Sequence, residues 1–261
     1  MLYNRLYNNV SNDSSQSLIV YLHGLLGSSD DWDRCAQLLP EYPTLCIDLP
    51  GHGMSKLMHC RDFKTCCDQI SDVLLTQFPH RPPIVLVGYS MGARIAMVGL
   101  TQQYFSAHNI QMLISEGGNF GLCSGAEKTA RLNNDSRWAE RFHHEPIEQV
   151  LGDWYQQPVF SSLNHEQRQT LIHKRSANLG PSIGKMLMAT SLAKQDYLLE
   201  SLTDLSIPVH YICGEKDSKF SRLAEQSGLS YSQVEQAGHN VHIEQPEAFT
   251  AIVKSQIRAF L

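Results

Sequence analysis

A serine between two glycines is the residue whose surroundings point most directly to chemistry. The sequence G-Y-S-M-G at Gly88–Gly92 follows an apolar run, Ile84–Val87, and precedes a segment with helical spacing. A sharp turn from strand to helix would force Ser90 into an exposed, strained position, and glycine on either side would remove Cβ atoms that clash with the backbone. The Met91 amide and the helix N-terminus would face a developing oxyanion. We therefore predict that Ser90 is the catalytic serine of an enzyme.

A serine of this kind needs a histidine and an acid, which in this arrangement come later in the chain. Asp217 and His239 each lie shortly after an expected strand, in this order. His239 would take the serine proton, and Asp217 would fix the imidazole tautomer and stabilise its charged form. Glu215 could in principle be the acid, but Asp217 lies further into the loop. His242 is close to His239 but lacks the preceding glycine turn.

The loop after the first predicted buried strand would supply a second donor to the oxyanion. It has the sequence H-G-L-L-G at His23–Gly27, and the Leu25 amide is the expected donor beside that of Met91. We interpret His23 itself as a structural residue of the loop. The tight turn Asp48–Gly53 lies near the same rim, and we interpret it as a well-packed loop without chemistry.

Arg94 lies one helical turn after Ser90, on the same face of the expected helix. That face would pack into the core, where an unpaired guanidinium is very costly. Either a buried acid pairs with Arg94 or the ligand brings an anion, and the position alone slightly favours the structural salt bridge. Arg131 and Arg175, with Trp154 between them, would suit a multiply anionic ligand, although such arginines are more often solvated surface residues.

These residues must be positioned by alternating strands and helices. Short apolar runs predict buried strands at residues 17–22, 44–49, 83–89, 112–115 and 208–213, with amphipathic helical segments between them. This alternation predicts an α/β fold with a mainly parallel sheet flanked by helices. It breaks between residues 121 and 202, where apolar residues recur at helical spacing. We predict a core formed by residues 1–120 and 203–261 and an inserted helical cap at residues 121–202.

Composition argues against several other classes of protein. The chain of 261 residues has 21 Lys and Arg against 26 Asp and Glu, a net charge of −5, so it has no basic footprint for nucleic acid. No apolar run approaches the roughly 20 residues of a membrane-spanning helix, and the N-terminus lacks the apolar segment of a signal peptide. The seven cysteines show no metal-binding spacing. We expect a cytoplasmic protein with reduced thiols and no bound metal.

The motifs together resemble a known family. H-G-x-x-G-S, D-L-P-G-H-G-x-S, G-Y-S-M-G and a late A-G-H are typical of the α/β-hydrolase fold with a cap. A closer resemblance, to the 2-succinyl-6-hydroxy-2,4-cyclohexadiene-1-carboxylate synthases of menaquinone biosynthesis, runs from about Leu18 to the C-terminus. It is carried by G-Y-S-M-G-A-R, S-E-G-G-N, D-W-Y-Q-Q-P-V-F-S-S-L-N, C-G-E-K-D-S-K-F and A-G-H-N. The D-W-Y-Q-Q-P-V-F segment lies in the expected cap, where hydrolase-fold families differ most, and is the most specific.

The resemblance implies a lyase that eliminates pyruvate from 2-succinyl-5-enolpyruvyl-6-hydroxy-3-cyclohexene-1-carboxylate, a small tricarboxylate, without an organic cofactor or a metal. Ser90, polarised by His239, would abstract the proton α to the succinyl ketone, and the Leu25 and Met91 amides would stabilise the enolate. The resemblance implies a triad of Ser90, Asp217 and His239, and a substrate pocket lined by Tyr89, Arg94, Arg131, Trp154 and Arg175.

Two other functions fit parts of the pattern. A serine carboxylesterase or a C–C bond hydrolase would use the same triad covalently, but its apolar acyl pocket would gain nothing from three cations. A catalytically inactive binding protein would have a broken triad, whereas Ser90, Asp217 and His239 are present in the required order. The ligand is expected to be a small molecule, and we expect the chain to be a monomer.

Overall fold

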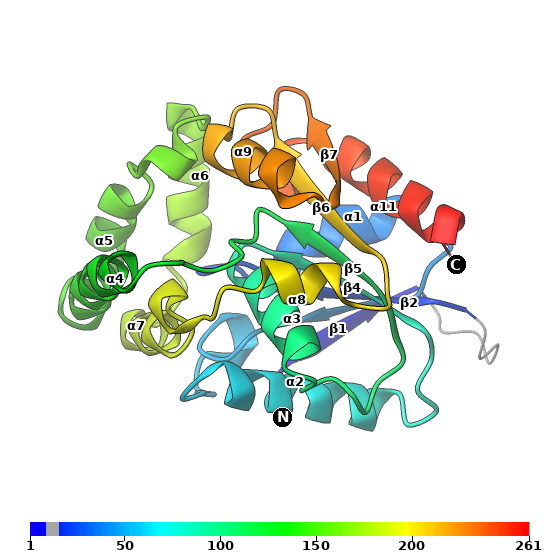
Figure 1. The fold of residues 1–261 in the computed structure, drawn as a ribbon. Helices are drawn as coiled ribbons and strands as arrows, with labels where there is room; N and C mark the ends of the chain where they lie inside the picture. Colours follow the sequence, from blue (N-terminus) through cyan, green and yellow to red (C-terminus); the bar gives the residue numbers. More distant parts are fainter. Residues whose placement is uncertain (9–15, 261) are drawn as a thin grey trace.

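Both faces of the central sheet are buried, and successive side chains along its inner strands point to opposite faces. The computed structural model describes residues 1–8 and 16–260 (Figure 1). In β2, Leu18–Leu22, the side chains of Leu18, Val20 and Leu22 enter one apolar cluster, and those of Ile19 and Tyr21 enter another on the opposite face. A strand with both faces buried must be covered by helices on both sides, as the near-continuous apolar runs of the sequence predict.

The described residues form a seven-stranded sheet in the order β1-β3-β2-β4-β5-β6-β7. Every neighbouring pair is parallel except β1 and β3, which are antiparallel. This arrangement confirms the predicted α/β fold with a mainly parallel sheet. Besides β2, the strands are β1 Asn4–Tyr7, β3 Thr44–Ile47, β4 Ile84–Tyr89, β5 Ile110–Glu116, β6 Val209–Gly214 and β7 Ser230–Val234.

Helices cover the two faces of the sheet and gather in a separate group at one side (Figure 1). Those packed along the sheet are α1 Asp33–Leu38, α2 Phe63–Gln77, α3 Met91–Thr101, α8 Leu199–Thr203, α9 Ser218–Ser227, α10 Val241–Glu244 and α11 Pro246–Phe260. The separate group is α4 Gly125–His144, α5 Ile147–Trp154, α6 His165–Arg175 and α7 Gly180–Ala189. Short 3-10 turns are η1 Ser29–Trp32, η2 Gly53–Ser55, η3 Pro158–Phe160 and η4 Leu192–Lys194. We call the region from α4 to α7 the cap.

The cap has an apolar cluster of its own, which includes Phe142, Val150, Leu171 and Ile183. Leu26, from the loop after β2, belongs to the same cluster, so the cap rests on the loops that follow the strands. The helical region thus lies where the sequence analysis expected it. The boundaries proposed there, residues 121 and 202, stay a prediction.

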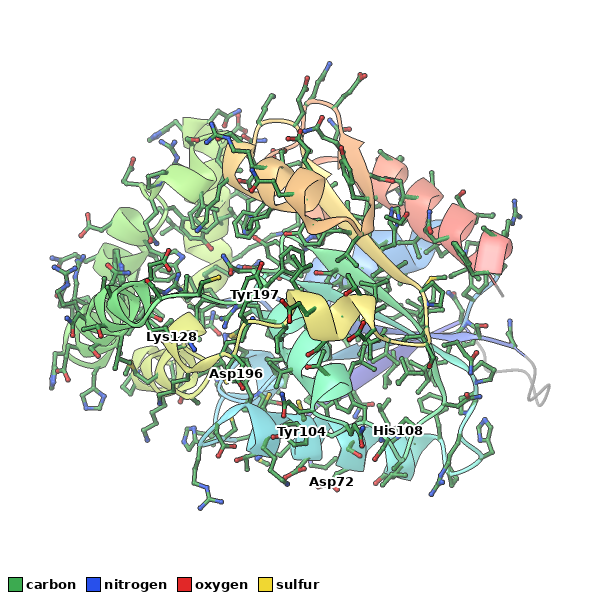
Figure 2. All side chains as sticks on the ribbon, viewed as in Figure 1. Asp72, Tyr104, His108, Lys128, Asp196 and Tyr197 are labelled. Carbon is green, nitrogen blue, oxygen red and sulfur yellow. The ribbon has the colours of Figure 1, made fainter. Side chains whose placement is uncertain are left out.

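Helix α3, which carries the residues after Ser90, is held against α2 by the α3–β5 connection. In Figure 2, Tyr104 and His108 lie beside α2, where the His108 ring is hydrogen-bonded to the Ser71 hydroxyl at 2.7 Å and Lys64 lies over the Tyr104 ring. These contacts join the segment after α3 to α2. No helix among residues 1–8 and 16–260 has the length and apolar character needed to cross a bilayer.

Candidate active site

Ser90 lies in the strained turn between β4 and α3 that the sequence predicts. Its backbone has φ 49° and ψ −105°, a conformation that costs a non-glycine residue energy. A Cβ at Gly88 would come within 2.6 Å of the Ala93 backbone, and one at Gly92 within 2.2 Å of the Leu22 carbonyl oxygen. Because both contacts are with backbone, the two positions must be glycine for the turn to close.

The three predicted triad residues meet in space. His239 Nδ1 is 2.7 Å from Asp217 Oδ2, and His239 Nε2 is 3.2 Å from Ser90 Oγ. Asp217 is the N-cap residue of α9, and its carboxylate also accepts a hydrogen bond from the Phe220 amide, which fixes its position. An ionised Asp217 can only accept, so Nδ1 carries the proton and Nε2 is free to receive one from Ser90. This is the geometry of a serine activated by a general base.

The two competing residues are engaged elsewhere. Glu215 accepts a hydrogen bond from the Gln236 amide at 3.0 Å. His242 is buried, with Nδ1 2.8 Å from a carboxylate oxygen of Glu116. Neither side chain takes the place of Asp217 or His239 in the contact with Ser90.

Leu25 and Met91, whose backbone amides are the predicted oxyanion donors, lie beside Ser90. Both residues line one cavity of about 110 Å³ together with Ser90. Met91 is the first residue of α3, whose opening amides have no acceptor within the helix. The two amides after Leu25 are already used, by His52 Nε2 for Leu26 and by the Gly24 carbonyl for Gly27, each at 3.0 Å.

Arg94 is buried on the same cavity without an acidic partner. Its Nη1 donates to the Thr190 carbonyl at 2.7 Å and lies 3.4 Å from the Gln195 side-chain oxygen. Its guanidinium also lies over the Phe63 ring. Among the described residues no carboxylate forms an ion pair with it. Burial, with a smaller contribution from nearby Arg131, lowers the pKa of Arg94 from its ordinary value. The structural salt bridge that the sequence slightly favoured is therefore not what this fold contains.

Two further cations reach the cavity, one of them missed by the sequence analysis. Arg131 and Trp154 line it as predicted, and Arg131 Nε is 2.8 Å from Asp135. Lys219 lines it as well, from the first turn of α9. Partial burial first, and Arg131 second, lower the pKa of Lys219, while the charge of Asp217 offsets part of this change. The available signal was its position two residues after Asp217, which places it at the same strand end.

The remaining two residues implied by the family resemblance do not line this cavity. The Tyr89 hydroxyl donates to the side-chain oxygen of Asn240, and its ring lies where a Cβ on Gly24 would be only 2.6 Å away. Tyr89 therefore packs between two loops, the one that carries His239 and the one at residues 23–27, which we call the oxyanion loop. Arg175 is buried and forms a 2.7 Å ion pair with Asp31.

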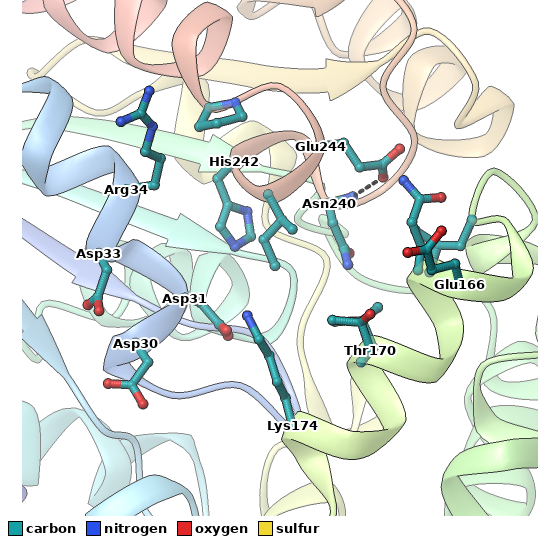
Figure 3. Close-up of a pocket in the computed structure, with 15 residues that line it drawn as sticks. Asp30, Asp31, Asp33, Arg34, Glu166, Thr170, Lys174, Asn240, His242 and Glu244 are labelled. Atoms are coloured by element: carbon teal, nitrogen blue, oxygen red, sulfur yellow. Dashed lines mark hydrogen bonds between the residues drawn. The ribbon is translucent and has the colours of Figure 1, made fainter.

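A larger cavity lies apart from Ser90. It has a volume of about 750 Å³ and separates α6 from η1 and α10, with Glu166 and Lys174 on one wall and Asp30 and Glu244 among the residues opposite (Figure 3). Ser90 is not among the residues that line it. Size alone does not make it the active site, because Ser90, the residues of the two predicted oxyanion donors and the cations Arg94, Arg131 and Lys219 line the smaller cavity.

Comparison with known proteins places this geometry in a family. Residues 17–246 match the family described as alpha/beta hydrolase fold. A protein of Yersinia enterocolitica named 2-succinyl-6-hydroxy-2,4-cyclohexadiene-1-carboxylate synthase is 46% identical over 91% of this chain and 85% of its own length. One of the same name from Serratia proteamaculans is 44% identical over 95% of this chain and 94% of its own.

Solved structures agree on the fold. MenH from S. aureus superimposes with a TM-score of 0.86 at 24% identity over 99% of both chains. A thermophilic esterase from Thermogutta terrifontis has a TM-score of 0.80 at 19% identity, over 99% of this chain and 93% of its own. At such identities the likeness concerns the fold alone, and the choice between lyase and esterase relatives rests on the sequence matches. The chain belongs to the α/β-hydrolase fold family and, within it, to the 2-succinyl-6-hydroxy-2,4-cyclohexadiene-1-carboxylate synthases.

Proposed function

We propose that this enzyme eliminates pyruvate from 2-succinyl-5-enolpyruvyl-6-hydroxy-3-cyclohexene-1-carboxylate, using Ser90, His239 and Asp217 to move the proton. The product is 2-succinyl-6-hydroxy-2,4-cyclohexadiene-1-carboxylate, the compound for which its relatives are named. The ligand is a small tricarboxylate. The cytoplasmic location and the monomeric state stay predictions.

The observation that carries the proposal is the buried, unpaired guanidinium of Arg94 beside Ser90. A buried charge without a partner is unfavourable unless a ligand supplies the opposite charge. Lys219 and Arg131, the latter paired with Asp135, line the same cavity. A substrate with carboxylates supplies the negative charge that Arg94 lacks, whereas the acyl group of a simple ester would bring none.

The triad then acts as a base without forming an acyl-enzyme. His239 Nε2 accepts the Ser90 proton, and Ser90 Oγ takes the proton α to the succinyl ketone. The electron pair of that C–H bond moves into the ketone and gives an enolate. When the ketone re-forms, the pair moves across the ring and breaks the C–O bond to the enolpyruvyl group. The departing enolate takes up a proton on carbon and becomes pyruvate, so no water is consumed.

The negative charge of the enolate develops on the ketone oxygen, where the Leu25 and Met91 amides can donate to it. Fixed donors of this kind stabilise a charge that appears only on the way to the transition state, which raises kcat rather than affinity. The same two amides would hold the tetrahedral oxyanion of an ester. The anionic groups of the substrate, and not the oxyanion site, therefore decide the reaction.

A paired assay on one preparation tests the proposal. The enolpyruvyl cyclohexene substrate is offered in one cuvette and a p-nitrophenyl ester in another, while diene absorbance, pyruvate and p-nitrophenol are followed. We expect diene and pyruvate to form in equal amounts, with slow ester cleavage. Efficient ester hydrolysis with no pyruvate above the spontaneous background would instead identify a serine esterase.

A further inference from the structure

The peptide between Gly24 and Leu25 is held in one orientation by the neighbouring histidine. The Gly24 carbonyl accepts from His23 Nδ1 at 2.7 Å and from the Gly27 amide at 3.0 Å. In a planar trans peptide the C=O and N–H groups point in opposite directions. Fixing the Gly24 carbonyl on one side therefore fixes the direction in which the Leu25 N–H points on the other.

The tautomer of His23 is determined by its two partners. A carbonyl oxygen can only accept, so Nδ1 must carry the proton that it donates to Gly24. An amide can only donate, and the Leu49 amide lies 2.9 Å from His23 Nε2, so Nε2 must be unprotonated. The ring is fully buried, and burial lowers the pKa of His23 to about 4. It stays neutral, with one tautomer, across the working range of an enzyme.

A second histidine, on the loop after β3, accepts a hydrogen bond from the loop that carries His23. His52, in the loop after β3, lies close to the Pro50 carbonyl through Nδ1 and accepts from the Leu26 amide through Nε2 at 3.0 Å. The His23 and His52 rings are 5.0 Å apart. Each loop thus supplies an imidazole that accepts a backbone amide of the other, and the oxyanion loop cannot shift without breaking both bonds.

From this geometry we propose that His23 is a positioning residue for the reaction. It orients the Leu25 amide toward the oxyanion through the Gly24 carbonyl, and the Leu49 amide and His52 keep it in place. His23 does not touch the substrate. The proposal rests on the proposed function for its natural substrate, but the same amide would serve any oxyanion formed at Ser90.

Substitution of His23 tests the proposal. His23→Leu removes the donor to Gly24, whereas His23→Asn keeps an amide donor near the position of Nδ1. We expect His23→Leu to lower kcat about 10- to 100-fold with KM changed less than about threefold, because an oxyanion donor acts in the transition state. His23→Asn should recover most of the lost kcat. Equal kcat in wild type and His23→Leu would overturn the proposal.

His210 provides a matched control. It is also buried on a strand end of the sheet, with its pKa lowered to about 4 by burial and two contacts of 2.9 Å, to the Ser230 and Ser232 hydroxyls. We expect His210→Leu to lower the melting temperature about as much as His23→Leu while kcat stays unchanged. A similar kcat loss in both variants would mean that His23 acts only through stability, which contradicts the proposal.

Two further measurements separate this proposal from the proposed function. The same kcat comparison is made on a p-nitrophenyl ester, so a wild-type enzyme that releases no pyruvate would overturn the lyase assignment and still leave the His23 effect measurable. If His23→Leu does not fold, 15N NMR of histidine-labelled wild type measures the tautomer of His23 directly. The His23 signals are assigned as those that are missing from the spectrum of His23→Asn. A signal with Nδ1 protonated and Nε2 unprotonated supports the proposal, and protonated Nε2 overturns it.

Discussion

The guanidinium of Arg175 and the carboxylate of Asp31 form an ion pair, Nη2 to Oδ2 2.7 Å, that joins cap helix α6 to the η1 turn. Both side chains are buried, with less than a tenth of their surface exposed. Burial alone would raise the pKa of Asp31, but the Arg175 charge and hydrogen bond outweigh it and hold that pKa below its ordinary value. Arg175 therefore joins the cap to the core, and its part in binding the substrate stays a prediction.

Asp31→Asn should destabilise the folded protein, because it leaves the Arg175 guanidinium buried without a counter-charge. We expect a loss of about 3 kcal/mol in the free energy of unfolding, measured by urea denaturation at pH 7. The double variant Asp31→Asn with Arg175→Gln should be less destabilised than the sum of the single variants. Additive effects would show that the ion pair does not couple the cap to the core.

Ser90→Ala should nearly abolish pyruvate release and leave the melting temperature close to that of wild type. General base catalysis contributes about 10²- to 10⁴-fold, and we expect a loss of kcat in this range. Because Ser90 and His239 act as one unit, the double variant with His239→Ala should be hardly slower than either single variant. Independent, multiplying losses would mean that the two side chains do not share one proton.

The features of the fold and the site that could be predicted from the sequence are those determined by residues close together in the chain. Ser90, Asp217 and His239 could be predicted because each lies after a strand, and parallel strands bring their carboxyl ends to one edge of the sheet. The glycines on either side of Ser90 predicted the turn itself. Strand β1 was missed, since Asn4–Tyr7 is short, partly exposed and antiparallel at the sheet edge, without the apolar run that marked the others.

The parts that do not follow depend on contacts between distant segments. Asp31 precedes Arg175 by 144 residues, and nothing local relates them. Whether Arg94 has an acidic partner could not be settled from its spacing, because its contacts are a carbonyl and an amide oxygen about a hundred residues away. Lys219 lies next to the strand end, but nothing in the sequence shows that it shares a cavity with Arg94 and Arg131, which belong to other elements.

Arg94→Met should separate activity from stability. Loss of a charge-assisted contact to a carboxylate costs roughly 1.5–3 kcal/mol, so we expect kcat/KM to fall about 10- to 100-fold. The free energy of unfolding should be unchanged or rise by up to about 2 kcal/mol, because the variant no longer buries an unpaired charge. Arg34→Met, which removes an exposed pair with Glu247, is the control and should change neither. Unaltered kcat/KM in Arg94→Met would contradict an anion site there.

Lys219→Met should weaken substrate binding more than turnover. The ammonium group lies on the same cavity as Arg94 and Arg131 but does not reach Ser90 in any contact of the structure. We expect KM to rise about 5- to 10-fold, with kcat changed less than about threefold. Added salt should raise the KM of the wild type more steeply than that of the variant, because the variant has one cation fewer whose attraction to the substrate salt can screen. An unchanged KM would remove Lys219 from the anion-binding set.

Acid should destabilise the protein well above the pH at which most carboxylates are protonated. Burial first, and then the neighbouring His23 charge, lower the pKa of His52 to about 3, and burial lowers that of His23 to about 4. In the unfolded chain both would titrate near 6.5. Below that pH the unfolded state binds more protons than the folded state, so stability falls as pH falls.

For His23 the change from 6.5 to about 4 corresponds to about 3 kcal/mol, lost progressively over that interval. Urea unfolding from pH 7.5 to pH 4 measures it directly. His210→Asn removes one such group away from the active site and should flatten the decline while activity at pH 7 is retained. A free energy of unfolding that is constant between pH 6.5 and 4.5 would show that these histidines are protonated in the folded state. His23 Nε2 and His52 Nε2 could then not accept the hydrogen bonds from the Leu49 and Leu26 amides.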